Sequence, residues 1–147
     1  MNGPIGVALD NSGGLYIADT SNSRVLYFAT GSTRASRVYG QDGNFTSFIR
    51  NKGGISATSL CDNKYITLDS SGGLYVAEAT NHRVLYFATG STTASRVYGQ
   101  GGNFTSNTVN KGGVSGDSFF SPHGVTLDSS GGLYVADAIN NRILYYV

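Results

Sequence analysis

The sequence has almost none of the features on which disulfide-bonded, zinc-binding or membrane-spanning proteins depend. A single cysteine in 147 residues excludes an internal disulfide and a zinc site made of several cysteines. No apolar run approaches the roughly 18 residues of a membrane-spanning helix. The opening residues Asn2-Gly3-Pro4 do not resemble a signal peptide. We therefore expect a single domain that does not bind membranes.

Charge is scarce as well. Only 13% of the residues are charged and the net charge is +1, so no field of one sign attracts nucleic acid or an anionic membrane. Two of the basic residues of the first repeat are not kept, because Arg34 and Arg50 correspond to Thr93 and Val109 in the second. Tryptophan is absent, whereas glycine, tyrosine and phenylalanine are plentiful. This composition favours turns and half-buried strands over a helical bundle.

An internal repeat dominates the chain. The segment Gly13-Gly14-Leu15-Tyr16 recurs from Gly72 and again from Gly131, so the period is 59 residues. A fixed period of this size indicates stacked supersecondary units. We interpret residues 1–147 as one propeller segment with repeats at 6–64, 65–123 and, incomplete, 124–147.

Each period contains four short runs of β-branched and aromatic residues, which Gly, Asn, Asp and Ser separate. In the first repeat the predicted strands are 6–10, 15–19, 24–28 and 35–39. No window has apolar residues at helical spacing over a useful length. Four antiparallel strands repeated in this way are typical of a propeller blade. The predicted fold class is therefore all-β, a β-propeller of four-stranded antiparallel blades with about three blades per chain.

The repeat resembles a known family. Its fullest copy follows the pattern Gly-Val-Thr-Leu-Asp-x-x-Gly-Gly-Leu-Tyr-Val-Ala-Asp and then Asn-x-Arg-Ile-Leu-Tyr, which is similar to the NHL repeat. The resemblance covers residues 6–28, 65–87 and 124–146. It implies a β-propeller, usually six-bladed, that acts mostly as a binding platform. Tyr65 and Asn63 replace the expected Gly and Pro in the second repeat, so we expect that loop to sit differently.

About three blades cannot close a ring, because each sheet would have to fill too wide a wedge. An open arc would leave two apolar sheet faces in water. Two copies would supply six blades, so we expect a homodimer that completes a six-bladed propeller. Ile143 and Tyr145 of one copy should then lie near Val7 and Leu9 of the other.

Acidic and basic residues recur at one place in every repeat. A carboxylate ends the second strand and an arginine begins the third, in the pairs Asp19 and Arg24, Glu78 and Arg83, Asp137 and Arg142. A catalytic site needs only one copy, so repetition predicts ion pairs that hold each hairpin. Loss of one pair should cost about 1 kcal/mol if it is partly exposed.

The aspartates that begin the Gly-Gly turns do not predict a metal site. Asp10, Asp69 and Asp128 lack the further carboxylates that a calcium loop needs. They suit turns instead, because aspartate accepts hydrogen bonds from nearby backbone amides. We therefore predict no metal, no cofactor and no catalytic residue.

The long fourth-to-first connection and the second-to-third turn should share one face of the propeller. That face has amides, hydroxyls and a few aromatic rings but little charge, which suits a protein, peptide or glycan ligand. The candidate binding residues are Gln41, Asn44, Phe45, Asn81, His82, Gln100, Asn103, Phe104 and His123. The alternative is that the loop packs its phenylalanines on the blade edge and only covers it.

The two histidines are the main departures from the repeat. His82 falls in the Asn-x-Arg turn, where a surface turn residue is expected. His123 precedes a first strand and should lie at one mouth of the central channel beside Ile5 and Lys64. An enzyme of the lyase or lactonase kind would show a larger set of unrepeated channel residues.

The sequence thus predicts a non-enzymatic NHL-type propeller module that assembles with itself and acts as a binding scaffold, without nucleic acid or membrane partners. One alternative is a designed or excised propeller fragment with no natural ligand, and a second is a propeller lyase or lactonase. An extracellular or cell-surface location is favoured, although no motif fixes the compartment.

Overall fold

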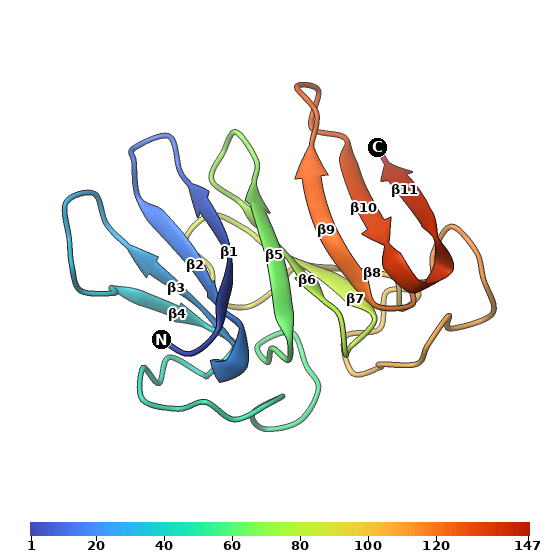
Figure 1. The fold of residues 1–147 in the computed structure, drawn as a ribbon, viewed down its shortest axis with the longest axis horizontal. Helices are drawn as coiled ribbons and strands as arrows, with labels where there is room; N and C mark the ends of the chain where they lie inside the picture. Colours follow the sequence, from blue (N-terminus) through green and yellow to red (C-terminus); the bar gives the residue numbers. More distant parts are fainter.

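In the computed structural model, which describes residues 1–147, the chain forms three antiparallel sheets that follow one another as blades (Figure 1). The first blade comprises β1 (Pro4–Leu9), β2 (Leu15–Asp19), β3 (Arg24–Phe28) and β4 (Arg37–Tyr39). The second comprises β5 (Asn63–Leu68), β6 (Leu74–Glu78), β7 (Arg83–Phe87) and β8 (Arg96–Tyr98). The third has β9 (Pro122–Leu127), β10 (Leu133–Asp137) and β11 (Arg142–Tyr146), in the order β11-β10-β9. The predicted all-β class and the four-stranded blades are confirmed.

Helical structure is limited to the short 3-10 segments η1 (Thr20–Asn22) and η2 (Ala138–Asn140). None of the helical segments has the length and apolar character needed to cross a membrane. Strands β2 and β3 have the predicted bounds, whereas β1 begins earlier and β4 begins later than predicted. The early start of β1 arises because Pro4 pairs with Asp19 across an irregularity in register.

The second repeat does not deviate at its first strand. Strand β5 occupies the same part of its repeat as β1 and β9, so the expectation of a displaced loop was wrong. Asn63 is buried where the other repeats have proline, and its side-chain amide donates a 2.9 Å hydrogen bond to the carbonyl of Arg24. This bond to the preceding blade holds the strand in place.

The Gly-Gly turns are shaped by their aspartates, as predicted. Asp10 Oδ1 accepts hydrogen bonds from the backbone amides of Ser12 and Gly14, at 2.9 and 2.7 Å. Asp69 and Asp128 do the same in their own turns. One carboxylate oxygen in each turn therefore accepts two hydrogen bonds from backbone amides.

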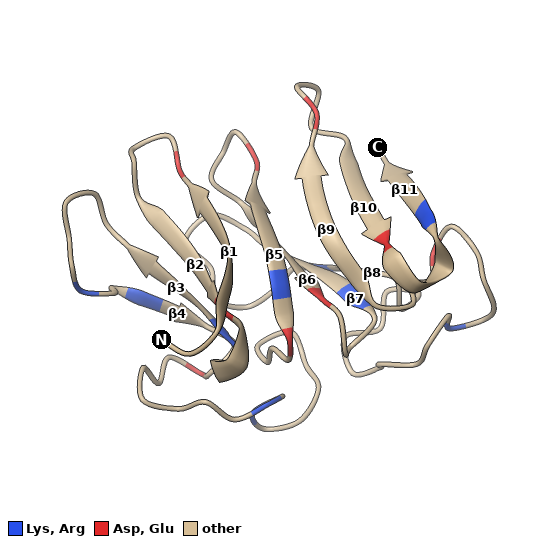
Figure 2. Ribbon diagram, in the orientation of Figure 1, with Lys and Arg blue, Asp and Glu red and all other residues tan.

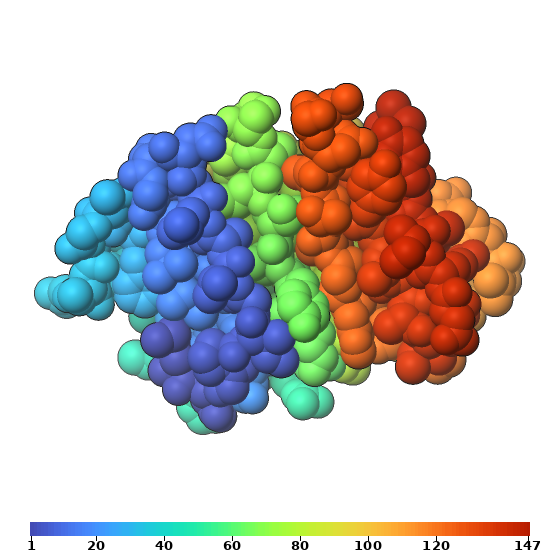
Figure 3. All heavy atoms as spheres, turned by 45° about the horizontal axis from the view of Figure 1, so that its top comes forward, coloured from blue at the N-terminus to red at the C-terminus, as the bar shows by residue number.

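The blades lie side by side, with β5 between β1 and β9 (Figures 1 and 3). The long connections 40–62 and 99–121 run beneath the sheets, at the end where β2 and β3 meet. Charged residues are few, and they lie on all three blades and in the connecting loops (Figure 2). The first and third blades form the two ends of the molecule.

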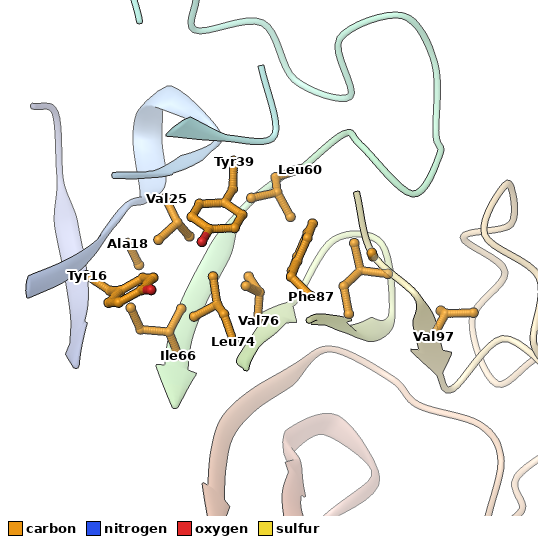
Figure 4. Close-up of a cluster of buried hydrophobic side chains, with 12 residues drawn as sticks. Tyr16, Ala18, Val25, Tyr39, Leu60, Ile66, Leu74, Val76, Phe87 and Val97 are labelled. Carbon is orange, nitrogen blue, oxygen red and sulfur yellow. The ribbon is translucent and has the colours of Figure 1, made fainter. Parts of the chain in front are cut away.

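The cores lie between blades rather than within them. The first core joins Tyr16, Ala18, Val25 and Tyr39 of blade one to apolar residues of blade two, among them Phe87 (Figure 4). A second core repeats this contact between blades two and three. Blade two thus packs against blade one with one face and against blade three with the other.

Gly99 follows β8 at the point where the next connection begins, and its φ of 92° favours glycine. A Cβ atom there would overlap the buried ring of Phe119. Gly99→Ala should destabilise the chain by about 2–4 kcal/mol, through strain in the left-handed conformation and overpacking. Gly90 has a φ of 79° but open space around it, so Gly90→Ala isolates the strain alone. If urea unfolding gives the same loss of stability for Gly99→Ala and Gly90→Ala, the overlap with Phe119 does not contribute.

Candidate functional site

The ion pairs expected at the loop end of each blade are present. The arginine Nε lies 2.7 Å from Asp19 Oδ2 in blade one, 2.5 Å from Glu78 Oε2 in blade two and 2.7 Å from Asp137 Oδ2 in blade three. All three carboxylates are completely buried. The repeated acidic and basic residues therefore form structural pairs, as the repetition predicts.

These pairs also fasten the long loops. In blade two, Glu78 Oε1 accepts hydrogen bonds from the amide of Cys61 and from Asn81 Nδ2, at 2.7 and 2.8 Å. The guanidinium of Arg83 donates to the carbonyls of Phe104, Ser56 and Ser59, at 2.6 to 3.1 Å. The charged groups of Glu78 and Arg83 thus find their hydrogen-bond partners within the protein.

The surroundings shift the acidity of these carboxylates. Burial raises the pKa of Glu78, and the Arg83 guanidinium opposes that rise. Burial acts the same way on Asp19, but hydrogen bonds from Asn2, Asn22 and Arg24 outweigh it and hold the pKa of Asp19 below its usual value. Hydrogen bonds to the charged form therefore decide the direction of the pKa shift at Asp19, whereas burial decides it at Glu78.

Two of the candidate binding residues, Gln41 and Gln100, are completely buried. Gln41 Nε2 donates to the carbonyls of Ser23 and Ile49, at 2.8 and 2.9 Å. Gln100 Nε2 donates to the carbonyls of His82 and Thr108, both at 2.9 Å. These amides bridge the loop to the neighbouring turn, so a ligand on the surface would not reach them.

Asn81 is also completely buried. It forms a reciprocal amide pair with Asn51, in which each side chain donates to the other at 2.8 and 3.1 Å. Asn140 pairs with Asn110 in the same way, at 2.7 and 3.1 Å. Each pair joins the loop of one blade to the turn of the next, and we call it the amide latch.

The remaining loop candidates differ in exposure. Asn44 and Asn103 are exposed, and their Oδ1 atoms accept hydrogen bonds from backbone amides two residues along the chain. Phe45 is exposed, whereas Phe104 packs against the first core. The alternative in which the loop covers the blade thus holds for Phe104 but not for Phe45.

Sequence reasoning missed the most exposed aromatic residue of the loop face. Phe48 is 68% exposed and Ile49 is 57% exposed, and both follow the exposed Phe45 within the same loop sequence. The second repeat has Asn107 and Thr108 at these positions. The departure from the repeat was the available signal. We call Phe45, Phe48 and Ile49 the apolar loop patch.

The two histidines are linked through one serine. His82 Nδ1 accepts a 3.1 Å hydrogen bond from the amide of Ser121, and Ser121 Oγ lies 3.3 Å from His123 Nε2. His82 is partly buried against Phe120, and burial lowers its pKa. His123 is exposed.

No group of three or more His, Cys, Asp or Glu side chains is placed to hold a metal ion. A cleft of about 240 Å³ opens between the Gly-Gly turns of blades one and two, lined in part by Asp10, Tyr16 and Arg37. This cleft contains none of the nine candidate residues named from the sequence. The nine residues remain a predicted binding set. Three of them, Gln41, Asn81 and Gln100, are completely buried and so do not face a ligand on the surface.

Comparisons with known structures agree with the blade architecture. The chain is similar to a streptogramin B lyase (TM-score 0.58, 14% identity), covering 99% of this chain and 40% of that one. It is also similar to hydrazine synthase from Kuenenia stuttgartiensis (TM-score 0.60, 12% identity, 99% and 36% covered). A third is catalytically inactive virginiamycin B lyase from Staphylococcus aureus with quinupristin (TM-score 0.58, 12% identity, 97% and 40% covered).

The chain therefore spans well under half the length of these structures, and the likeness concerns the fold. No curated protein matches the sequence significantly. The family model for the NHL repeat matches residues 1–28 and 119–145. These matched segments lie in the first and third blades, so the NHL repeat is found at the two places where the sequence resembles it most closely.

Proposed function

We propose that this chain is a non-enzymatic NHL-type propeller module in which two copies close a six-bladed ring and the loop face binds a protein or peptide. The observation that carries the binding function is the apolar loop patch. Its exposed Phe48 and Ile49 are not required by the repeat, because the second blade folds with Asn107 and Thr108 at the same positions.

The chemistry of the patch favours a protein or peptide over a glycan. Exposed apolar clusters with a polar rim are typical of protein interaction sites. The rim here comes from Asn44 and the hydroxyl residues beside it, while Arg24 is paired with Asp19. Affinity should therefore depend mainly on apolar burial.

Ring closure is supported by the two ends of the chain. Tyr16 and Val25 of blade one are buried against blade two, but the equivalent Tyr134 and Ile143 of blade three are exposed. At the other end, Val7 and Leu9 are each 67% exposed. Their equivalents in blade three, Val125 and Leu127, pack against blade two. The contact between neighbouring blades forms twice within the chain. Each end of the molecule exposes one of the two surfaces that such a contact needs.

A second copy fits these ends better than any unrelated surface. Blade three of one copy against blade one of the other would repeat the existing blade contact, and making it twice closes the assembly. Burial of apolar area contributes about 25 cal/mol per Å². Closure also leaves no apolar end face in water.

The binding function can be tested with a displayed library of random peptides selected on the whole chain. Phe48→Ala combined with Ile49→Ala should weaken selected peptides by at least about tenfold, because the apolar anchor is lost. The matched control is Asn107→Ala combined with Thr108→Ala, at the equivalent positions of the second loop. Selection of peptides that bind both double variants equally well would overturn the proposal, and so would failure to select any.

An enzyme is the second candidate, because the His82–Ser121–His123 contact occurs once in the chain and two structural neighbours are lyases. Quinupristin is the probe that one neighbour's structure names. Consumption of quinupristin by the chain, abolished by His123→Ala, would replace the scaffold proposal. Quinupristin that stays intact supports the scaffold.

A further inference from the structure

The cleft between the Gly-Gly turns of blades one and two lies at the opposite end of the strands from the long connecting loops (Figure 1). Most of the residues that line it are polar. Its volume of about 240 Å³ is smaller than the roughly 300–1,000 Å³ of pockets that take drug-sized ligands. The cleft therefore suits a small polar ligand. Both of its walls belong to one chain, so it does not depend on ring closure.

Two charged side chains line this cleft, Asp10 and Arg37. Both are half-buried, and neither takes part in any of the four ion pairs of the protein. A ligand with a charge of one sign would be attracted by one of these groups and repelled by the other. The cleft therefore favours a neutral ligand that meets a carboxylate and a guanidinium at once.

Both charged groups have hydrogen-bonding capacity that the protein leaves unused. Asp10 Oδ1 accepts the two turn amides, whereas Oδ2 accepts no backbone hydrogen bond. Burial and the neighbouring Asp10 carboxylate raise the pKa of Tyr27, so the hydroxyl beside that carboxylate stays protonated. The guanidinium of Arg37 donates to the Tyr39 hydroxyl at 3.3 Å, and its other N–H groups have no acceptor in the protein. A ligand can thus accept from Arg37 and donate to Asp10.

Serine hydroxyls surround these two charges. Ser12 comes from the turn of blade one, while Ser70 and Ser71 come from the turn of blade two. Their backbone groups form hydrogen bonds, but their side-chain hydroxyls form none within the protein. Each hydroxyl can donate one hydrogen bond and accept others. The lining therefore matches a ligand whose own groups both donate and accept.

Hydrogen bonds hold the two walls of the cleft in place. Asn11 Nδ2 in blade one donates to the Ser70 carbonyl in blade two at 3.0 Å. Thr89 Oγ1 donates to the Ser71 carbonyl at 2.6 Å, which ties together two turns of blade two. Asn11 departs from the repeat, because Ser70 and Ser129 occupy this position in the other blades. A preformed cleft of this kind reduces the cost of ordering when a ligand binds.

The corresponding cleft between blades two and three lacks this combination of groups. It has the same volume of about 240 Å³, but Asp69 and Asp128 line it and no arginine does. Arg96 corresponds to Arg37 but is exposed, with its guanidinium over the ring of Tyr98. Only the cleft between blades one and two therefore offers a carboxylate and a guanidinium together.

We propose that the cleft between blades one and two binds a sugar residue through adjacent hydroxyl groups. One sugar hydroxyl accepts from Arg37 and its neighbour donates to Asp10, while the serine hydroxyls contact the others. Hydroxyls suit both partners because they are neutral and each donates and accepts. Hydrogen bonds to charged groups are also stronger than those between neutral groups. This site is additional to the peptide site on the loop face.

The test titrates the whole chain with the methyl glycosides of glucose, galactose, mannose and N-acetylglucosamine, followed by saturation-transfer NMR. At least one of them should bind saturably with a Kd below about 10 mM. The absence of binding for all of these sugars up to that concentration would overturn the proposal. Binding of inorganic phosphate or alanine without any sugar would also overturn it, because the cleft would then take an anion or a zwitterion.

The same titration with the free sugars identifies the source of the ligand. Equal binding of a methyl glycoside and its free sugar supports a site for the end of a glycan chain. Binding of the free sugar alone supports a site for a soluble sugar, because the methyl group is then excluded. Either result supports the proposal.

Two variants locate the site, each with a matched control. Arg37→Ala removes the donor, and Ser71→Trp fills the cleft from an exposed position, so each should weaken sugar binding at least about tenfold. The controls Arg96→Ala and Ser130→Trp, at the equivalent positions of the next blade, should leave binding unchanged. Unchanged binding in Ser71→Trp would overturn the proposal, and so would an equal loss in the controls. Thermal unfolding by circular dichroism checks that Ser71→Trp is folded.

The loop-face variant separates this proposal from the proposed function. The chain with Phe48→Ala and Ile49→Ala should bind the sugar as the unmodified chain does. Loss of sugar binding in that variant would place the sugar on the loop face and overturn the proposal. Failure to select any peptide would contradict the proposed function but leave a sugar site that Ser71→Trp blocks.

Discussion

Arg83→Ala is expected to lower the free energy of unfolding by about 3–5 kcal/mol, because it leaves a buried carboxylate without its partner. The side chains of Arg83 and Glu78 are both completely buried. The substitution also removes the donor for three loop carbonyls. Urea unfolding monitored by circular dichroism measures the loss, provided that the slope with denaturant stays unchanged.

The matched control is Arg142→Ala in the third blade. The side chain of Arg142 is 23% exposed, so its removal opens a path by which water can reach Asp137, and the loss of stability should be clearly smaller. Similar losses for the two variants, or a loss below about 1 kcal/mol for Arg83→Ala, would contradict this account. The sequence-based expectation of about 1 kcal/mol assumed a partly exposed pair, and the complete burial of Arg83 corrects it.

The unmodified chain is expected to scatter light as a species of twice the 15.4 kDa chain mass at micromolar concentration. Ile143→Asp should convert it to single chains, because a charge on the end face of blade three would be buried without a partner. Val114→Asp introduces the same charge on the loop connection. Val114 and Ile143 are both 65% exposed, so the two variants differ in place rather than in accessibility.

Three results would contradict the closed ring. The first is a stable species of one chain mass for the unmodified protein. The second is a series of ever larger species with rising concentration, which indicates an open head-to-tail contact. The third is dissociation by Val114→Asp, which would move the interface from the end faces to the loops.

Much of the fold could be predicted because its signals are local. Strands β2 and β3 follow from the alternation of β-branched residues with Gly-Gly and Asn-x-Arg turns, and their ends matched the prediction. The ion pair between Asp19 and Arg24 followed from its repetition. These features depend on neighbours within one hairpin.

The loop face could not be predicted as well, because its contacts join distant segments. A polar stretch around Gln41 or Gln100 suggests a surface, yet these amides are buried because they satisfy carbonyls of another turn. Asn81 is hidden by Asn51 of the preceding loop. Phe48 has no counterpart in the second repeat, so neither the repeat nor the family pattern marks it as a surface residue.

The amide latch has a consequence for how such a ring would come apart. Each chain carries two latches, one between blades one and two and one between blades two and three. Both partners of a latch are uncharged amides, so neither acid nor salt releases it. Asn22, the equivalent of Asn81 and Asn140, donates to Asp19 as they donate to their own carboxylates, but it has no asparagine partner, so the proposed junction between two copies lacks a latch. Mechanical or thermal stress should therefore open the ring first along its two seams, releasing intact three-blade halves that can close again.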